Sequence, residues 1–312
     1  MEMISREVKV EDFAIVQRIV DAHQLSLHPS EKRFGEAEAR QVIHGFFEPA
    51  ITRFIKRVES DDWESFLTIN PDISRSRLYV DLYVVPGSGL LESVLSTALT
   101  LARQEHPGFR LWLGVHSKDL AYQNLLERRG FSLLRRYWTM ELSLEGVTRG
   151  APQGDVEIRE VDLSDDDDVH TYWSVHQDSF SKHFGFMPRE FSTWKEMVRR
   201  DGTEVNMKVW LLEVDGREVG FVDCDDSLIH EGCGFVSGLG VRQEFHGRGF
   251  GEILLRHAIN YSLESGLEKV VLSVDTGNES GALRLYEKVG MKPISESHHY
   301  ENMNWADEAR SS

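Results

Sequence analysis

Hydrophobic and polar residues follow two different periods in the second half of the chain. Residues 208–214 and 217–223 are apolar runs with strand character, and they flank Asp215 and Gly216, a pair typical of a tight hairpin turn. Residues 252–266 instead repeat their apolar positions every three or four residues, which predicts an amphipathic helix. The residues that fall on the apolar face are Leu255, Ala258, Ile259 and Ser262. The pattern is therefore that of an α/β protein.

Further elements follow from the same reading. Strands are expected at 234–241 and 269–274, and a helix at 279–290. The acidic run Asp162–Val169 reads as the solvated start of a helix, because Asp or Ser there caps the first turn and complements its dipole.

The chain repeats itself at long range. The tripeptide at Arg6–Val8 recurs at Arg159–Val161, and the segment Glu127–Phe131 resembles Glu287–Met291. The lags are 153 and 160 residues, so the offset drifts by only seven. Such a lag indicates a duplicated domain with a few insertions. Residues 146–154 between the copies are rich in Gly and Pro and predict a linker, so the expected domains are 1–145 and 155–312.

Composition narrows the class of protein. The chain has 312 residues and a formal charge of −17, of which residues 151–312 contribute 16 basic and 31 acidic side chains. That acidity argues against a nucleic-acid partner and favours cationic ones. No apolar run is long enough to cross a bilayer, and no signal peptide is visible. The two cysteines have neither metal-ligand nor disulfide spacing. A cytoplasmic protein without metal is expected.

One glycine-rich segment carries candidate chemistry. The hexapeptide His246–Gly251 follows a predicted strand and opens a predicted helix. The first amides of a helix lack partners within it, and the dipole adds positive potential there, so this loop is suited to hold phosphates. The dinucleotide pattern fails because its third glycine is missing, and the P-loop fails for want of a final Gly-Lys-Ser/Thr. A simple turn remains the alternative.

A second motif lies downstream. Asn278, Ala282, Tyr286 and Gly290 follow one another at intervals of four residues. Together with the glycine loop, this pattern resembles the GNAT superfamily of acyl-CoA-dependent N-acetyltransferases. The first position of the loop motif is His246 here, where the family has Gln or Arg. The resemblance implies two tandem GNAT folds, each a mixed, mostly antiparallel sheet flanked by helices.

The resemblance also implies a cofactor and roles for residues. Acetyl-CoA would be the acyl donor, and a small amine the acceptor, attacking directly in a ternary complex. Tyr286 would protonate the departing thiolate, which suits a phenol that stays protonated at neutral pH. Asn278 would hydrogen-bond the cofactor. The remaining implied cofactor-binding residues are Leu239, Gly240, Val241, His246, Gly247, Arg248, Gly249, Phe250, Gly251 and Glu252.

The general base is not fixed by the motifs. Many members of the family carry a Glu midway along the strand before the loop, but Phe235 and Val236 occupy that region here. An amine with an ordinary pKa is almost fully protonated at neutral pH, so some proton acceptor is needed. Glu231 is the nearest candidate in sequence. The other candidates are Asp223, Asp225, Asp226 and His230.

The first copy lacks the signature. With Gly130 aligned to Gly290, Leu126 stands at the position of Tyr286 and Lys118 at that of Asn278, while a shortened segment replaces the glycine loop. A degenerate first domain with a catalytic second one resembles the layout of mycothiol synthases. Acetylation of an amino-sugar thiol precursor is thus an alternative function. A non-catalytic acetyl-CoA-binding regulatory protein is another.

Overall fold

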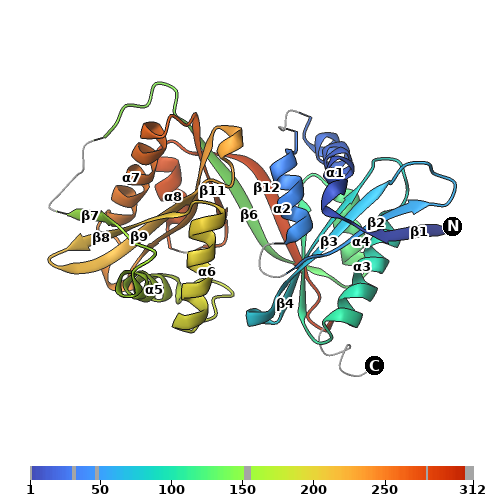
Figure 1. Cartoon of the computed structure of the whole chain (residues 1–312), viewed down its shortest axis with the longest axis horizontal. Helices are drawn as coiled ribbons and strands as arrows, with labels where there is room; N and C mark the ends of the chain where they lie inside the picture. Colours follow the sequence, from blue (N-terminus) through green and yellow to red (C-terminus); the bar gives the residue numbers. More distant parts are fainter. Residues whose placement is uncertain (1, 30–32, 46–48, 151–155, 279, 306–312) are drawn as a thin grey trace. The chain divides into compact units, whose positions relative to one another are not determined.

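The computed structural model describes residues 2–29, 33–45, 49–150, 156–278 and 280–305, and its elements are labelled in Figure 1. The chain forms two compact units. Unit 1 comprises the residues up to Arg136 together with those from Ser297 onward, and unit 2 comprises Tyr137–Glu296. Each unit is a sheet with helices on both faces, which confirms the predicted α/β class.

The sheet of unit 1 has the strand order β1-β2-β3-β4-β5-β12. Neighbouring strands pair antiparallel except β4 and β5, which run parallel. The strands are β1 (Met3–Glu7), β2 (Ile51–Arg57), β3 (Ser65–Asp72), β4 (Arg77–Val84), β5 (Arg110–His116) and β12 (Lys292–Glu301). The α-helices of this unit are α1 (Phe13–Leu27), α2 (Glu36–His44), α3 (Leu91–Glu105) and α4 (Leu120–Arg128).

The sheet of unit 2 repeats that plan with the order β7-β8-β9-β10-β11-β6. Only β10 and β11 run parallel. The strands are β6 (Ser132–Ser143), β7 (Glu157–Glu160), β8 (Lys208–Val214), β9 (Arg217–Asp225), β10 (Cys233–Val241) and β11 (Lys269–Asp275). The α-helices are α5 (Asp166–Phe180), α6 (Phe191–Glu204), α7 (Phe250–Glu264) and α8 (Ala282–Lys288).

The two copies in the sequence exchange their last strands. Residues 137–143 of β6 pair with β11 in unit 2, and residues 297–301 of β12 pair with β5 in unit 1. The compact units therefore differ at these strands from the expected domains, 1–145 and 155–312. Of the expected linker, residues 146–150 have no regular structure, and 151–154 lie outside the described residues.

Local predictions in the second copy are confirmed. Asp215 and Gly216 have φ of 50° and 73°, the left-handed pair that a tight hairpin between β8 and β9 requires. The apolar face expected on α7 is buried. Asp165 caps α5, where its carboxylate accepts hydrogen bonds from the amides of Asp167 and Asp168. The last predicted helix is shorter than expected, because α8 begins only at Ala282.

Helices cover both faces of the unit 2 sheet (Figure 1), and a separate apolar cluster lies on each face. On one face, side chains of α7 and α8 pack on Val222 of β9 and Val236 of β10. On the other face, α5 and α6 pack on Phe221 of β9 and Leu211 of β8. Adjacent residues of one strand point to opposite faces, so Phe221 and Val222 serve different helix pairs.

Candidate functional site

The parallel strands β10 and β11 diverge at a defined residue. They pair only up to Val236 and Leu272, although β10 continues to Val241 and β11 to Asp275. The pairing of β10 with β9 contains a β-bulge at Ser237, the first residue beyond the paired segment. A bulge bends its strand and increases the local twist. We call the region in which the ends of β10 and β11 run without pairing to each other the splay.

The glycine-rich loop follows directly from the end of β10. A short 3₁₀ helix, η4 (Gln243–Phe245), leads into it, and α7 begins at Phe250. Gly247 and Gly249 have φ of 77° and 84°, a left-handed conformation that side chains other than glycine disfavour. A Cβ on either would meet no atom within 4 Å, so the loop leaves open space above both residues.

The amides of this loop are largely without partners. Its turn hydrogen bonds are donated by the amides of His246, to Gln243 at 3.3 Å, and of Glu252, to Gly249 at 3.1 Å. In the part of the chain that the structure describes, the amides of residues 247–251 donate none. They stand at the N-terminus of a 15-residue helix, whose dipole adds positive potential.

The acidic residue of the loop, Glu252, is neutralised by neighbouring basic side chains. The carboxylate of Glu252 is 2.6 Å from Lys288 and 2.9 Å from Arg256. Hydrogen bonds from Lys288 and Arg256 lower the pKa of Glu252 below its ordinary value. The Arg248 guanidinium lies 5.0 Å from the centre of the Phe245 ring. An anion at the loop therefore meets no uncompensated carboxylate from Glu252.

His246 closes the loop onto the strand before it. Its Nε2 lies 2.8 Å from the carbonyl oxygen of Val241. A carbonyl only accepts hydrogen bonds, so Nε2 carries the proton in this contact. His246 thus ties the first residue of the loop to the last residue of β10.

Two other glycines allow close packing around the splay. A Cβ on Gly251 would lie 3.2 Å from Leu285 of α8 and 3.8 Å from Leu239 of β10. A Cβ on Gly240 would lie 2.6 Å from the Phe221 ring and 2.7 Å from Ser179 of α5. Glycine at these positions brings α7, α8 and α5 against the end of β10.

Tyr286 and Asn278 lie on the segment that follows β11. Tyr286 is on α8, buried in the same apolar cluster as Val236, and burial raises the pKa of its phenol to about 12. Asn278 is in the turn between β11 and α8, where its Oδ1 accepts a hydrogen bond from the amide of Ser280 at 2.9 Å. Its own amide donates to Asp275 at 3.1 Å.

Glu231 lies at the other end of β10. It ends the short 3₁₀ helix η3 (Ile229–Glu231), before the strand begins at Cys233. Four strand residues, about 13 Å, separate Cys233 from the bulge at Ser237. The structure therefore places Glu231 away from the splay, at the opposite end of β10 from Leu239–Val241 and the glycine loop.

Asp223, one of the alternatives to Glu231, lies beside the bulge. Its carboxylate accepts hydrogen bonds from Tyr172 at 2.5 Å and from Ser237 at 3.0 Å. The side chain is buried, and burial raises its pKa to about 6 despite these hydrogen bonds. Asp223 stands two residues after Phe221, so the alternation along β9 places it on the same face of the sheet, whereas Glu231 lies outside the strands.

Unit 1 keeps the backbone form of the loop that the sequence suggested it had lost. There β4 and β5 pair only up to Val80 and Leu113. The following loop places Gly87 and Gly89 at φ of 80° and 73°, just before α3. The shortened segment retains two left-handed glycines two residues apart. Leu126 is a buried core residue of α4.

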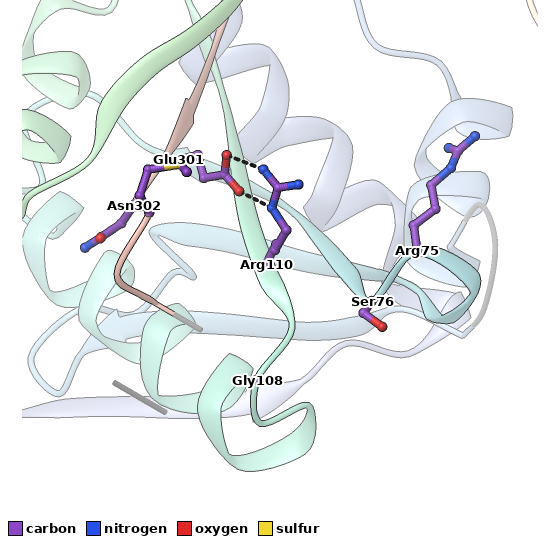
Figure 2. A pocket seen from close by; sticks show the side chains of 7 residues that line it. Arg75, Ser76, Gly108, Arg110, Glu301 and Asn302 are labelled. Carbon is purple, nitrogen blue, oxygen red and sulfur yellow. Dashed lines mark hydrogen bonds and ion pairs between the residues drawn. The ribbon is translucent and has the colours of Figure 1, made fainter. Parts of the chain in front are cut away.

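Unit 1 contains a cavity of about 320 Å³ (Figure 2). It is lined by residues at the beginnings of β4 and β5 and the end of β12, whereas the loop of this unit follows the end of β4. Arg110 and Glu301 face each other there, with hydrogen bonds of 2.6 and 2.8 Å. Its principal charges are thus already paired.

Comparison with known proteins agrees with the motifs of unit 2. Residues 170–291 match the model of the acetyltransferase (GNAT) family. This segment is a GNAT domain. It contains most of α5, all of α6 to α8, the splay and the glycine loop. An uncharacterised N-acetyltransferase of Methanocaldococcus jannaschii is 29% identical over 149 residues, which cover 43% of this chain and 60% of that protein. The chain thus matches less than two thirds of that relative.

Solved structures share the fold of the whole chain. A GCN5-related N-acetyltransferase from Sphaerobacter thermophilus has a TM-score of 0.81 at 19% identity and covers 96% of this chain and 95% of its own. A tandem GNAT protein from the clavulanic acid biosynthesis pathway has a TM-score of 0.75 at 13% identity and covers 96% and 98%. These likenesses show the tandem GNAT fold. Among the described residues, no helix is long and apolar enough to cross a membrane.

Proposed function

We propose that unit 2 is an acetyl-CoA-dependent N-acetyltransferase that acts on a small amine by direct attack in a ternary complex. The observation that carries this proposal is the combination of the splay with the undonated amides of residues 247–251 at its end. An extended, phosphate-bearing thioester needs both features: an unpaired strand edge along its arm and clustered amide donors for its phosphates.

The loop and the strand would bind different parts of acetyl-CoA. The amides of residues 246–252 face the pyrophosphate, with those of residues 247–251 as the donors still available. The backbone of Leu239, Gly240 and Val241 would pair with the pantetheine arm in place of β11. Asn278, whose Oδ1 is occupied by Ser280, keeps its side-chain NH₂ to donate to the donor molecule.

Tyr286 would act as the acid of the reaction. Its raised pKa keeps the phenol protonated at neutral pH, so it can donate a proton to the sulfur as the C–S bond breaks. The thioester supplies the free energy for acetyl transfer, and the chain positions the reactants and moves the protons. The face of the sheet on which Tyr286 lies would then be the leaving-group side.

The acceptor that charge favours is a cationic amine, because residues 151–312 carry 31 acidic against 16 basic side chains. We further propose that the first domain is degenerate and that turnover is confined to unit 2. Acetylation of an amino-sugar thiol precursor falls within the same chemistry and is one arm of the test below.

A turnover assay with a panel of acceptors tests the proposal. Free thiol release from acetyl-CoA should depend on an added amine, with alkylamines, polyamines, amino sugars and an amino-sugar thiol precursor as the panel. Mass spectrometry of the acceptor should show an added acetyl group. A chain that binds acetyl-CoA but leaves every amine unmodified would instead be a binding protein, and the proposal would be wrong.

A further inference from the structure

Three hydrogen-bonded side chains connect the surface at the bulge with a buried carboxylate. Ser237, exposed on β10, donates to Asp223 Oδ1 at 3.0 Å. Tyr172 of α5 donates to Asp223 Oδ2 at 2.5 Å. Asp223 is only 5% exposed, and Tyr172 only 2%. Ser237 is therefore the member of this group that a bound molecule can reach.

We propose that Ser237 and Asp223 form the proton relay that deprotonates the acceptor amine in unit 2. This inference rests on the proposed function and adds to it the missing proton acceptor. If phosphates bind at the loop after Val241, the arm of the donor runs back along β10, and its thioester reaches the point where the strands diverge. Ser237 stands at that point, as the first residue beyond the pairing with β11.

The relay and Tyr286 lie on opposite faces of the sheet. Tyr286 belongs to the cluster under α7 and α8, whereas Tyr172 packs with Phe221 on the face of α5 and α6. Because β10 and β11 are not paired in the splay, a thioester lying there is open to both faces. The amine can then approach from the α5 side while the sulfur leaves toward Tyr286.

Each proton that leaves the acceptor amine has a defined destination. The ammonium of the acceptor gives one proton to Ser237 Oγ, which passes its own hydroxyl proton to the Asp223 carboxylate. The neutral amine forms a C–N bond with the thioester carbon, and the C–S bond breaks. Tyr286 gives its proton to the sulfur and regains one from the nitrogen. Asp223 finally releases its proton to water, so the amide, the free thiol and one proton are formed.

The surroundings of Asp223 suit this task. Burial raises its pKa to about 6, so at neutral pH the carboxylate is mostly ionised and still a useful base. The ionisable groups that act on it are Tyr172 of α5 and Asp225 of β9. His176 packs on the Tyr172 ring, and Asp201 of α6 acts on Tyr172. Cys224 neighbours it along β9 but packs in the cluster on the other face.

Gly238 is part of the same arrangement. A Cβ there would lie 2.7 Å from both carboxylate oxygens of Asp223, so the carboxylate occupies the space that a side chain would need. The bulge thus places an exposed hydroxyl and a glycine side by side over one buried acid. If Asp223 only held the bulge in place, its replacement would slow the acetylation of every acceptor to the same extent, whatever the basicity of the acceptor.

The experiment compares two acceptors, of which only one must lose a proton before it can attack. An alkylamine is protonated at pH 7, whereas an arylamine is already neutral. Against the alkylamine, we expect Asp223→Asn to lower kcat about 100-fold and Ser237→Ala at least about 10-fold. Acetyl-CoA KM should stay unchanged, Ser237→Thr should restore most of the rate, and the arylamine should be acetylated almost normally by every variant.

Asp81→Asn provides the matched control. Asp81 of unit 1 lies in β4 opposite Thr68 of β3, and burial raises its pKa to about 6, as for Asp223. We expect this variant to keep wild-type kcat. Ser237→Ala, at an exposed position, keeps the test valid if Asp223→Asn does not fold.

Several results would overturn the relay. Wild-type kcat for Ser237→Ala on the alkylamine would do so, as would an equal loss on both acceptors, which indicates misplacement of the donor. A Glu231→Gln variant that loses the alkylamine activity while Ser237→Ala keeps it would assign the base to Glu231. A wild-type chain inert toward both amines would overturn the proposed function itself and the relay with it.

Discussion

Replacing Gly249 by Ala tests whether the left-handed conformation of the loop is needed to bind acetyl-CoA. Gly249 has φ of 84°, and nothing lies within 4 Å of an added Cβ, so the substitution meets no steric obstacle in the protein. The cost is backbone strain of about 1–2 kcal/mol for a residue with a side chain in this conformation. If the loop relaxes to relieve that strain, its binding form becomes about 5- to 30-fold less populated, and acetyl-CoA KM rises by the same factor.

Gly89→Ala is the matched control in unit 1. Gly89 has φ of 73° and equally open space around an added Cβ. Denaturant unfolding should show a similar loss of free energy for both variants, of about 1–2 kcal/mol. Steady-state kinetics should show a raised acetyl-CoA KM for Gly249→Ala only. Equal KM values in the two variants would refute the assignment of the donor to the loop of unit 2.

Three further predictions concern the acid, the packing of the loop and the buried carboxylate. Tyr286→Phe should lower kcat and kcat/KM alike by about 10²–10⁴-fold, at unchanged acetyl-CoA affinity by calorimetry, and a near-normal kcat would exclude this acid. Gly251→Val would crowd Leu285, 3.2 Å from the added Cβ, and should weaken acetyl-CoA binding about tenfold without changing the circular dichroism spectrum. Because the folded pKa of Asp223 is raised to about 6, its contribution to stability is lost as pH rises from about 4 to 6. Asp223→Asn should remove that loss, on the order of 3 kcal/mol by urea unfolding, and an unchanged pH dependence would contradict the raised pKa.

Much of unit 2 could be predicted from the sequence, because its turns and helix faces are determined by residues that are close together in the chain. The turn at Asp215 and Gly216 and the face of α7 each depend on residues within one or two turns of chain. The glycine motif likewise indicated a loop at the start of a helix. In unit 1, however, Gly87 and Gly89 keep the same backbone form inside a different sequence, so the absence of a motif did not mean the absence of the loop.

Pairings between distant segments could not be predicted. Hydrophobic periodicity can indicate that a segment is a strand, but it does not say which strand it will pair with, and β6 and β12 are exchanged between the copies. The proton acceptor could not be predicted for the same reason. Tyr172 and Asp223 are 51 residues apart and meet only because α5 packs on β9, whereas Glu231 is nearer in sequence to the loop and lies at the far end of β10.

Amide hydrogen–deuterium exchange with and without acetyl-CoA tests the central claim most directly. The amides of residues 247–251 have no partner in the described structure, so they should exchange rapidly in the free chain and become protected when acetyl-CoA binds. Peptides covering Leu239–Val241 should gain protection at the same time, while η3 with Glu231 should not change. Saturating acetyl-CoA that leaves residues 247–251 unprotected, with protection instead at the cavity beside Arg110, would contradict the account.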